Sequence, residues 1–300
     1  MKLKTPHWFV YALLTTLSWG IWGAFIEIPE KAGFPATLGF IVWAISMIPF
    51  MAIAMLNAGW RLERRWPSIR DGLFIGLTGA GGNLLLFEAL RTGPAYIVFP
   101  FVSLYPVMTV VLSLVFLKEK ASPRQWVGIA VALAAIFFLS WQDGGDKNVA
   151  GGTWLVLAVL IFILWGAQNV VFKSANRHTS AESLFVYMTI GGLLLAPVAW
   201  AMTETGQTIN WGLKGFWLLA LLHLLNSAGA LAVVYAYRYG KALVVAPMTG
   251  LAPVITVILS LIVYGVVPGL MLSTGIILAA AAMVLLPDNG DEEAEESSKV

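Results

Sequence analysis

Long apolar runs follow one another along almost the whole of this chain. Ten such runs, bounded by charged residues, glycine or proline, cover approximately residues 8–27, 36–57, 72–90, 95–117, 124–141, 153–172, 182–202, 215–236, 242–264 and 268–287. Each approaches the ~20 apolar residues that a helix needs to cross a bilayer. Hydrophobic residues make up 59% of the sequence and charged residues only 11%, against about 25% charged residues in soluble domains. The sequence therefore predicts an all-α integral membrane protein with ten transmembrane helices.

Lysine and arginine are distributed unequally between the two sides of these predicted spans. Of the 18 such residues, 14 fall in segments on the side of the N-terminus, and Lys31, Arg91, Lys147 and Lys214 fall on the other side. Because cytoplasmic loops carry the positive excess, both termini are expected in the cytoplasm of a cell with a bacterial-type inner membrane. The acidic tail at 288–300 is expected to be disordered.

The chain contains an internal repeat. A shift of 147 residues superimposes 89–139 on 236–286 without a gap, and 20 of these 51 pairs are identical. Upstream, Trp22-Gly23-Ala24 matches Trp165-Gly166-Ala167 at a shift of 143. We therefore expect Trp22 and Trp165 to be equivalent and the second half to have gained four residues after them. The predicted units are a first repeat at 1–147, a second repeat at 148–287 and the tail at 288–300.

Each repeat holds five predicted spans, and this odd number inverts the second repeat relative to the first. Inverted repeats are typical of secondary transporters, whose halves move around a site near the bilayer midplane. The symmetry therefore favours a small-molecule transporter that works by alternating access around a central cavity. A duplicated membrane protein with another function would show the same repeat, so that alternative stays open.

Two matched segments carry a family resemblance. They are Tyr96-Ile-Val-Phe-Pro-Phe-Val-Ser-Leu-Tyr-Pro-Val-Met-Thr, followed by Leu-Lys-Glu119, and Leu-Val-Val-Ala-Pro247-Met-Thr-Gly-Leu-Ala-Pro253-Val-Ile-Thr. Both resemble the EamA-type drug/metabolite transporter superfamily, and the resemblance covers nearly the whole chain. It implies ten helices with cytoplasmic termini, a cavity lined by spans 1 to 4 and 6 to 9, and export of compounds such as amino acids. Sugar or nucleoside transport stays open. One departure is that the counterpart of Glu119 is Val266.

Two prolines interrupt each of the predicted spans 4 and 9. They are Pro100 and Pro106 in the first repeat and Pro247 and Pro253 in the second. A proline removes a backbone donor and clashes with the preceding turn, and freed carbonyls are tolerated at membrane depth only where they face protein or water. Matched interruptions in two halves point to a substrate-binding site. The alternative is a kink that serves packing alone.

Polar and tryptophan side chains inside the apolar runs complete the predicted substrate-binding site. They are Trp22, Asn83, Trp165, Gln168, Asn169, His223 and Asn226. Because an unsatisfied polar group in hydrocarbon is costly, these side chains are expected to face inward. The tryptophans are suited to stack on a planar or apolar substrate, and His223 to relay protons. Hydrogen bonds that only join helices are the alternative.

Glu88 and Arg91 stand three residues apart, so they are expected to form an ion pair at the outer end of span 3. The residues 147 positions later are Tyr235 and Arg238. These four are the predicted gating residues. A simple interfacial ion pair is the alternative for Glu88 and Arg91.

The sequence gives little support to an enzyme. It has no cysteine, no HExxH or GxSxG motif and no inward pair of carboxylates, so no catalytic residue, metal or cofactor is expected. The run from Gly76 to Gly82 lacks the lysine of a phosphate-binding loop and is interpreted as close helix packing. The arginines from Arg61 to Arg70 are expected to face lipid head groups rather than nucleic acid. The expected partners are a small-molecule substrate and the lipid bilayer, with the chain as a monomer or homodimer.

Overall fold

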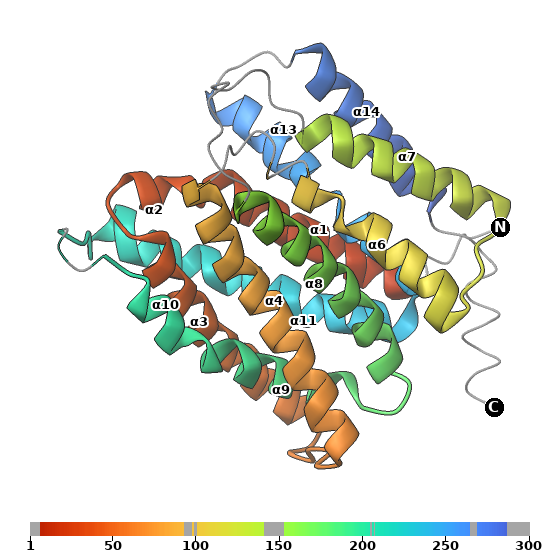
Figure 1. The fold of residues 1–300 in the computed structure, drawn as a ribbon, viewed down its shortest axis with the longest axis horizontal. Helices are drawn as coiled ribbons and strands as arrows, with labels where there is room; N and C mark the ends of the chain where they lie inside the picture. Colours follow the sequence, from red (N-terminus) through yellow and green to blue (C-terminus); the bar gives the residue numbers. More distant parts are fainter. Residues whose placement is uncertain are drawn as a thin grey trace.

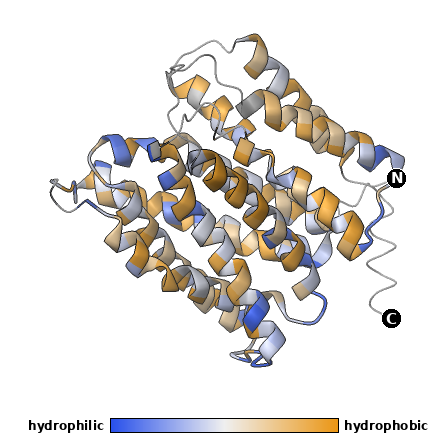
Figure 2. Cartoon of the chain, in the orientation of Figure 1, coloured by the Kyte–Doolittle hydropathy of each residue, from blue (hydrophilic) through white to orange (hydrophobic). Residues whose placement is uncertain are grey.

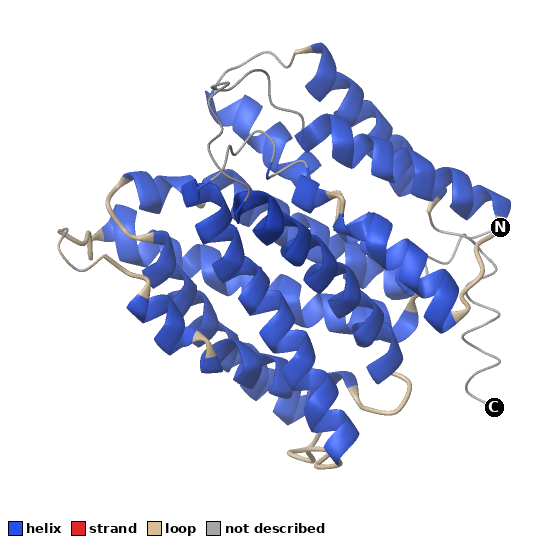
Figure 3. Ribbon diagram, viewed as in Figure 1, coloured by secondary structure: helices blue, strands red, loops and turns tan. Residues whose placement is uncertain are grey.

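The computed structural model describes residues 7–92, 98, 101–140, 153–204, 206, 208–264 and 269–286, and these form helices joined by short loops, without a strand (Figure 3). The helices are α1 (His7–Phe25), α2 (Glu27–Lys31), α3 (Ala36–Asn57), α4 (Trp66–Thr92), α6 (Tyr105–Leu112), η1 (Ser113–Leu117), α7 (Pro123–Ser140), α8 (Thr153–Ala175), α9 (Ala181–Leu194), α10 (Ala196–Ala201), η2 (Leu213–Trp217), α11 (Leu218–Tyr239), α12 (Ala242–Thr249), α13 (Ala252–Tyr264) and α14 (Leu270–Leu285). The all-helical fold agrees with the prediction.

Among the described residues, seven helical segments are long and apolar enough to cross a membrane. They are His7–Lys31, Ala36–Asn57, Trp66–Arg91, Thr153–Ala175, Ala181–Ala201, Leu213–Tyr239 and Ala242–Val263. Three shorter apolar helical segments, Phe101–Leu117, Pro123–Phe138 and Leu270–Leu285, lie where three further spans were expected. Apolar residues dominate along the helices, and hydrophilic residues gather at several of their ends (Figure 2). The chain is therefore a multi-pass membrane protein, and the count of ten spans stays a prediction.

The two halves of the chain pack against each other through matching pairs of helices. In one set, α4 packs against α8 and α9, and in the matching set α11 packs against α1 and α3. Likewise α6 packs against α8, and α13 against α1. Helices α7 and α14, the last of each half, lie side by side at one edge of the bundle (Figure 1). This arrangement is the one expected of two repeats related by a pseudo-two-fold axis.

Two helix breaks occur at equivalent positions. One lies at Leu104, just before α6, and the other lies at Gly250 and Leu251, between α12 and α13. Pro106 and Pro253 stand at the second residue of the helix that follows each break. The predicted interruptions are therefore found beside these two prolines. Pro247 lies within α12, and Pro100 lies outside the described residues.

A further break was not predicted. It lies at Leu195, between α9 and α10, and Pro197 stands in the first turn of the helix that follows. The largest buried cluster includes Trp8 at the start of α1, Tyr237 near the end of α11, and Ala242, Leu243, Val244, Val245 and Met248 of α12. We call this end of the bundle, where α1 begins and α11 ends, the proximal end. The opposite end, where α4 ends, is the distal end.

Candidate functional site

Helix α11 carries two of the predicted site residues to its crossing with α1 and α3. The side-chain oxygen of Asn226 accepts a hydrogen bond from the indole nitrogen of Trp43, at 2.9 Å. The backbone oxygen of Asn226 accepts another from the indole nitrogen of Trp19, at 3.2 Å. The hydroxyl of Ser46 on α3 contacts the hydroxyl of Ser227 at 2.8 Å and donates to the backbone oxygen of His223 at 3.1 Å. Side chains of α1 and α3 are thus bonded to α11.

His223 and Trp22 lie together in this crossing but have unpaired polar atoms. Their ring centroids are 6.2 Å apart, and His223 is only 5% exposed. Both imidazole nitrogens and the indole nitrogen of Trp22 are buried without a hydrogen-bond partner among the described residues. Gly39 on α3 faces the same ring, because a Cβ added to it would lie 3.7 Å from Nε2 of His223. Since an unpaired buried donor costs about 1–3 kcal/mol, a ligand that bonds these atoms would gain affinity.

A second group of predicted site residues joins α8 to α4. Trp165 donates its indole N–H to the backbone oxygen of Gly79, at 3.3 Å, and Asn83 donates to the same oxygen at 3.1 Å. Gln168 donates to the backbone oxygen of Ile75 at 2.8 Å. Backbone carbonyls of α4 therefore accept from all three donors. The bonds of Trp165 and Gln168 join α8 to α4, whereas the bond of Asn83 lies within α4.

The glycines of α4 permit this close approach. A Cβ added to Gly79 would overlap the amide of Gln168, one added to Gly82 would overlap the indole of Trp165, and one added to Gly76 would overlap the backbone oxygen of Met188. The run from Gly76 to Gly82 is therefore a surface for close helix packing, as predicted.

Asn169 and the prolines lie near the helix breaks. The side-chain nitrogen of Asn169 donates to the hydroxyl of Thr109 on α6 at 3.2 Å, and that hydroxyl donates to the backbone oxygen of Gly166 at 3.3 Å. A Cβ added to Gly250, in the break between α12 and α13, would lie 3.0 Å from Cγ of Pro106. The break in the second half therefore lies against the proline of the first.

The contacts correct the predicted equivalence of Trp22 and Trp165. Trp165 donates to Gly79, and Trp19, 146 residues earlier, donates to Asn226, the residue 147 positions after Gly79. The flanking contacts agree, because Thr109 donates to the backbone oxygen of Gly166 and Thr256 to that of Gly20.

The structural counterpart of Trp165 is therefore Trp19, and Trp22 corresponds to Gln168. The prediction was wrong because the sequence Trp19-Gly20-Ile-Trp22-Gly23 contains two Trp-Gly pairs three residues apart. Residue identity alone favoured the pair Trp22-Gly23, because Trp22-Gly23-Ala24 is identical to Trp165-Gly166-Ala167. With the corrected shift of 146 residues, the halves differ here by one residue rather than four.

The predicted gating residues lie at both ends of the bundle. At the distal end, Glu88 and Arg91 form the predicted ion pair, with 2.5 Å between Oε1 and the guanidinium nitrogen. At the proximal end, Tyr235 donates to Glu182 at 2.7 Å, and Arg238 donates to the backbone oxygens of 176 and 179 at 2.6 and 3.0 Å. The equivalent arginines thus lie at opposite ends, as inverted halves require. The gating role of these residues stays a prediction.

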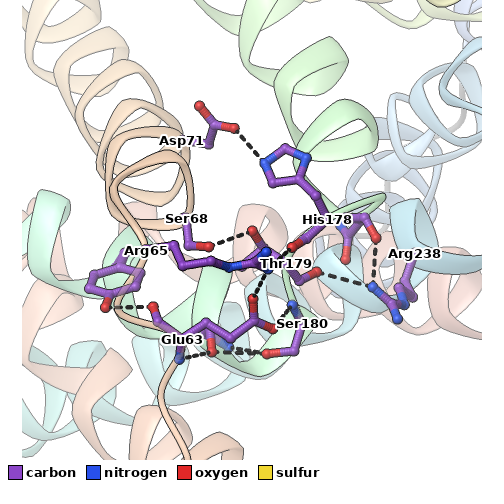
Figure 4. Close-up of polar contacts among 11 residues, drawn as sticks. Glu63, Arg65, Ser68, Asp71, His178, Thr179, Ser180 and Arg238 are labelled. Carbon is purple, nitrogen blue, oxygen red and sulfur yellow. Dashed lines mark hydrogen bonds and ion pairs between the residues drawn. The ribbon is translucent and has the colours of Figure 1, made fainter.

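A polar network at the proximal end was not predicted (Figure 4). The loop before α4 and the first turns of α4 meet the α8–α9 connection there: the guanidinium of Arg65 donates to the backbone oxygen of His178 at 2.5 Å, and Ser68 contacts the hydroxyl of Thr179 at 2.8 Å. Asp71 lies 3.1 Å from Nε2 of His178. The sequence shows charged residues in both loops, but no spacing between these residues indicated that the two loops meet.

Glu63 contributes a carboxylate to this network. Its Oε1 accepts the backbone N–H of Ser180, the N-cap of α9, at 2.8 Å, and its Oε2 lies 2.8 Å from the guanidinium of Arg65. Partial burial raises the pKa of Glu63, but the hydrogen bonds from Arg65 and Ser180 outweigh burial, and the pKa is lowered overall. The network joins the loop before α4 in the first half to the start of α9 in the second.

Comparison with known proteins identifies the family. A model of the EamA-like transporter family matches residues 7–141 and 152–286. A protein of Streptantibioticus cattleyicolor named a probable terminal-alkyne amino-acid exporter is 28% identical over 209 residues, which make up 68% of this chain and 67% of that protein. A riboflavin transporter of Rhizobium johnstonii is 28% identical over 180 residues, which make up 57% of this chain and 55% of that protein. The chain thus spans about half the length of the riboflavin transporter.

Two further comparisons extend over most of the chain. The uncharacterized transporter YvbV of Bacillus subtilis is 24% identical over 272 residues, or 90% of this chain and 85% of that protein. A solved crystal structure covers 94% of this chain and 96% of its own, with a TM-score of 0.76 at 16% identity, and so shows the fold alone. Because the family model matches both halves, this chain belongs to the EamA-like transporter family and is a multi-pass membrane transporter.

Proposed function

We propose that the protein is a secondary transporter that exports a small polar or amphipathic metabolite, with an amino-acid-like compound as the favoured substrate. It works by alternating access between two inverted five-helix halves, 1–147 and 148–287, which together span the bilayer ten times. Both termini, with the acidic tail at 288–300, are in the cytoplasm below a bacterial-type inner membrane. The observation that carries this proposal is the pair of side chains Trp22 and His223, which lie in a crossing of three helices and whose buried polar atoms have no hydrogen-bond partner among the residues that the structure describes.

The chemistry of these two side chains suits an amino acid. The indole N–H of Trp22 is a donor only, whereas imidazole offers at least one N–H and, when neutral, one acceptor nitrogen. A substrate carboxylate accepts from such donors, and a substrate ammonium donates to a neutral imidazole. The Trp22 ring supplies an apolar surface for the substrate side chain. The similarity to an amino-acid exporter supports this choice.

A planar heterocycle, such as a nucleoside-like compound, is the second candidate. It is favoured by the aromatic surface of Trp22 beside the imidazole and by the similarity to a riboflavin transporter. The same two side chains would then stack on the ring and bond its polar edge. Substrate competition between an amino acid and a flavin or nucleoside distinguishes the two.

The other predicted residues support this site in different ways. Asn83, Trp165, Gln168, Asn169 and Asn226 are already bonded within the protein, and in our proposal they hold the helices that form its walls. The prolines allow the helices of spans 4 and 9 to bend during the transport cycle. The Glu88–Arg91 pair closes the distal end, and Tyr235 and Arg238 hold the proximal end.

Transport by the purified protein in liposomes tests the proposal. Labelled amino acids, riboflavin, nucleosides and sugars are offered singly, with and without a pH gradient, and accumulation of an amino acid is expected. Trp22→Phe removes the indole donor and His223→Leu removes the imidazole. Each variant loses a hydrogen bond to a charged substrate group, and such a bond contributes about 1.5–3 kcal/mol. KM is therefore expected to rise at least about tenfold in each variant.

The matched control is Trp200→Phe, which changes an indole that is 59% exposed on α10. It is expected to transport with the KM of the wild type. Transport of no compound in the panel would refute the proposed function. Wild-type KM in both Trp22→Phe and His223→Leu would instead remove these residues from the substrate-binding site while leaving the transporter assignment intact.

A further inference from the structure

Glu119 is presented to the second half of the protein by an unusual local backbone. It follows the π-helix η1, which ends at Leu117, and Lys118 has a φ of 54° in the left-handed region. The backbone N–H of Glu119 then bonds the oxygen of Ser113 at 3.3 Å. A left-handed conformation is unfavourable for a residue with a side chain, and π-helical turns are often found at functional positions. This turn ends the helix and directs the next side chain toward α12.

The carboxylate of Glu119 caps the start of α12. Oε1 accepts the backbone N–H of Ala242 and Oε2 accepts that of Leu243, each at 3.0 Å. The first N–H groups of a helix have no partner within the helix and carry its positive dipole end. Both capped residues are fully buried, so water cannot easily replace the carboxylate. Loss of Glu119 would therefore leave two buried donors without a partner.

Other charged and titratable groups face this carboxylate. Lys173 of α8 and Arg177 of the connection after α8 attract the negative charge of the carboxylate. Tyr237 of α11 lies close enough that an ionised Tyr237 and the carboxylate would repel each other. Burial raises the pKa of Glu119, and the bonds from Leu243 and Ala242 oppose that rise, as do the two cations. The site is therefore enclosed by both halves of the protein.

The cap joins segments of different halves at one end of the bundle. Glu119 follows η1, the last helical segment before α7 in the first half, whereas α12 lies in the second half and leads to the break that lies against Pro106. Every residue of α12 is buried, so the proximal end is closed to solvent at α12 in this arrangement. We propose that Glu119 is a positioning residue that clasps α12 in this closed arrangement, and that release of the clasp opens the proximal end during transport. This consequence for transport rests on the proposed alternating access.

The opposite end lacks a carboxylate at the corresponding sequence position. Val266 stands 147 residues after Glu119, and valine has no side-chain acceptor. A similar difference separates Glu63 from the residue 147 positions later, Asn210, which donates to the backbone oxygen of Ala32 at 3.0 Å. The residues at these two pairs of equivalent positions therefore differ in chemistry between the halves.

Thiol labelling tests the clasp without any substrate, so a failed transport assay leaves this test intact. Because the chain has no cysteine, Val244→Cys places a single reporter on α12, at a residue that is fully buried. Its labelling by a water-soluble maleimide is expected to be slow in otherwise wild-type protein. Glu119→Ala is expected to speed it at least about tenfold, the equivalent of about 1.4 kcal/mol. Glu119→Gln keeps one acceptor oxygen and is expected to give a smaller increase.

Two controls separate clasp release from general loosening. Glu63→Ala removes another first-half carboxylate that accepts a backbone N–H of the second half, and it should leave Val244→Cys labelling unchanged. A second reporter, Thr203→Cys, lies at the distal end, where Thr203 contacts Thr37. Its labelling should not rise in Glu119→Ala. Slow labelling of Val244→Cys in Glu119→Ala, an equal effect of Glu63→Ala, or faster labelling at both ends would overturn the proposal.

Discussion

Replacing Gly76 by alanine tests whether direct backbone contact holds α4 against α9. A Cβ added to Gly76 would overlap the backbone oxygen of Met188 and lie 3.0 Å from Cα of Gly191. Because both atoms belong to the backbone of α9, no side-chain rotation can relieve the overlap. The two helices must therefore move apart in the variant.

The size of the effect follows from two opposing terms. Overpacking of a close contact costs about 1–3 kcal/mol, whereas replacing glycine by alanine inside a helix stabilises it by about 1 kcal/mol. Gly76→Ala is therefore expected to lose up to about 2 kcal/mol of unfolding free energy. Gly81→Ala on the same helix is the matched control, because its added Cβ would meet only Cδ1 of Leu195, at 3.7 Å. That variant is expected to be as stable as the wild type or slightly more stable.

Both variants are compared with the wild type in detergent micelles by titration with a denaturing detergent. Loss of helix is followed by circular dichroism, and the free energy of unfolding is taken from the transition. Gly76→Ala should unfold at a lower denaturant fraction than Gly81→Ala. Equal midpoints for the two variants would refute the idea that the glycines of α4 are placed by close contact with α9.

Two further outcomes are expected. Asn226→Leu leaves the indole N–H of Trp43 unpaired and should lower the unfolding free energy by about 1–3 kcal/mol in the same titration, and an unchanged midpoint would contradict the bond. Glu63 has a lowered pKa, so its contribution to stability is present at neutral pH and lost as the pH falls through that pKa. In thermal unfolding, the melting temperature of Glu63→Gln should therefore fall less on acidification than that of the wild type.

Hydropathy and the repeat predicted the elements that depend on local sequence. Apolar runs located the helices because each run can satisfy its own backbone hydrogen bonds within the membrane. The ungapped repeat predicted interruptions in two equivalent helices, and the structure has them at Leu104 and Leu251. The ion pair of Glu88 and Arg91 was also predictable, since three residues separate them on one helix.

The partners of the polar side chains were not predictable in this way. Which carbonyl Gln168 or Trp165 reaches depends on how two helices cross, and no local pattern encodes the crossing. The carboxylates show the same limit, because Glu63 and Glu119 bond residues 117 and 123 positions away. The resemblance marked Glu119 as part of a motif, yet only the fold identifies the helix that it caps.

The two halves share their contact geometry but differ in the side chains that make it. The residues 147 positions after Gly76 and Gly79 are His223 and Asn226. On α4 the glycines bring the backbone of α9 and the side chains of α8 against the helix, and the polar donors there end on backbone carbonyls. On α11 the equivalent face presents an amide that is hydrogen-bonded to Trp43 and an imidazole that has no hydrogen-bond partner in the described part of the chain. Because binding a polar substrate requires unpaired donors or acceptors, we place the proposed substrate contacts on the face of α11 rather than on that of α4.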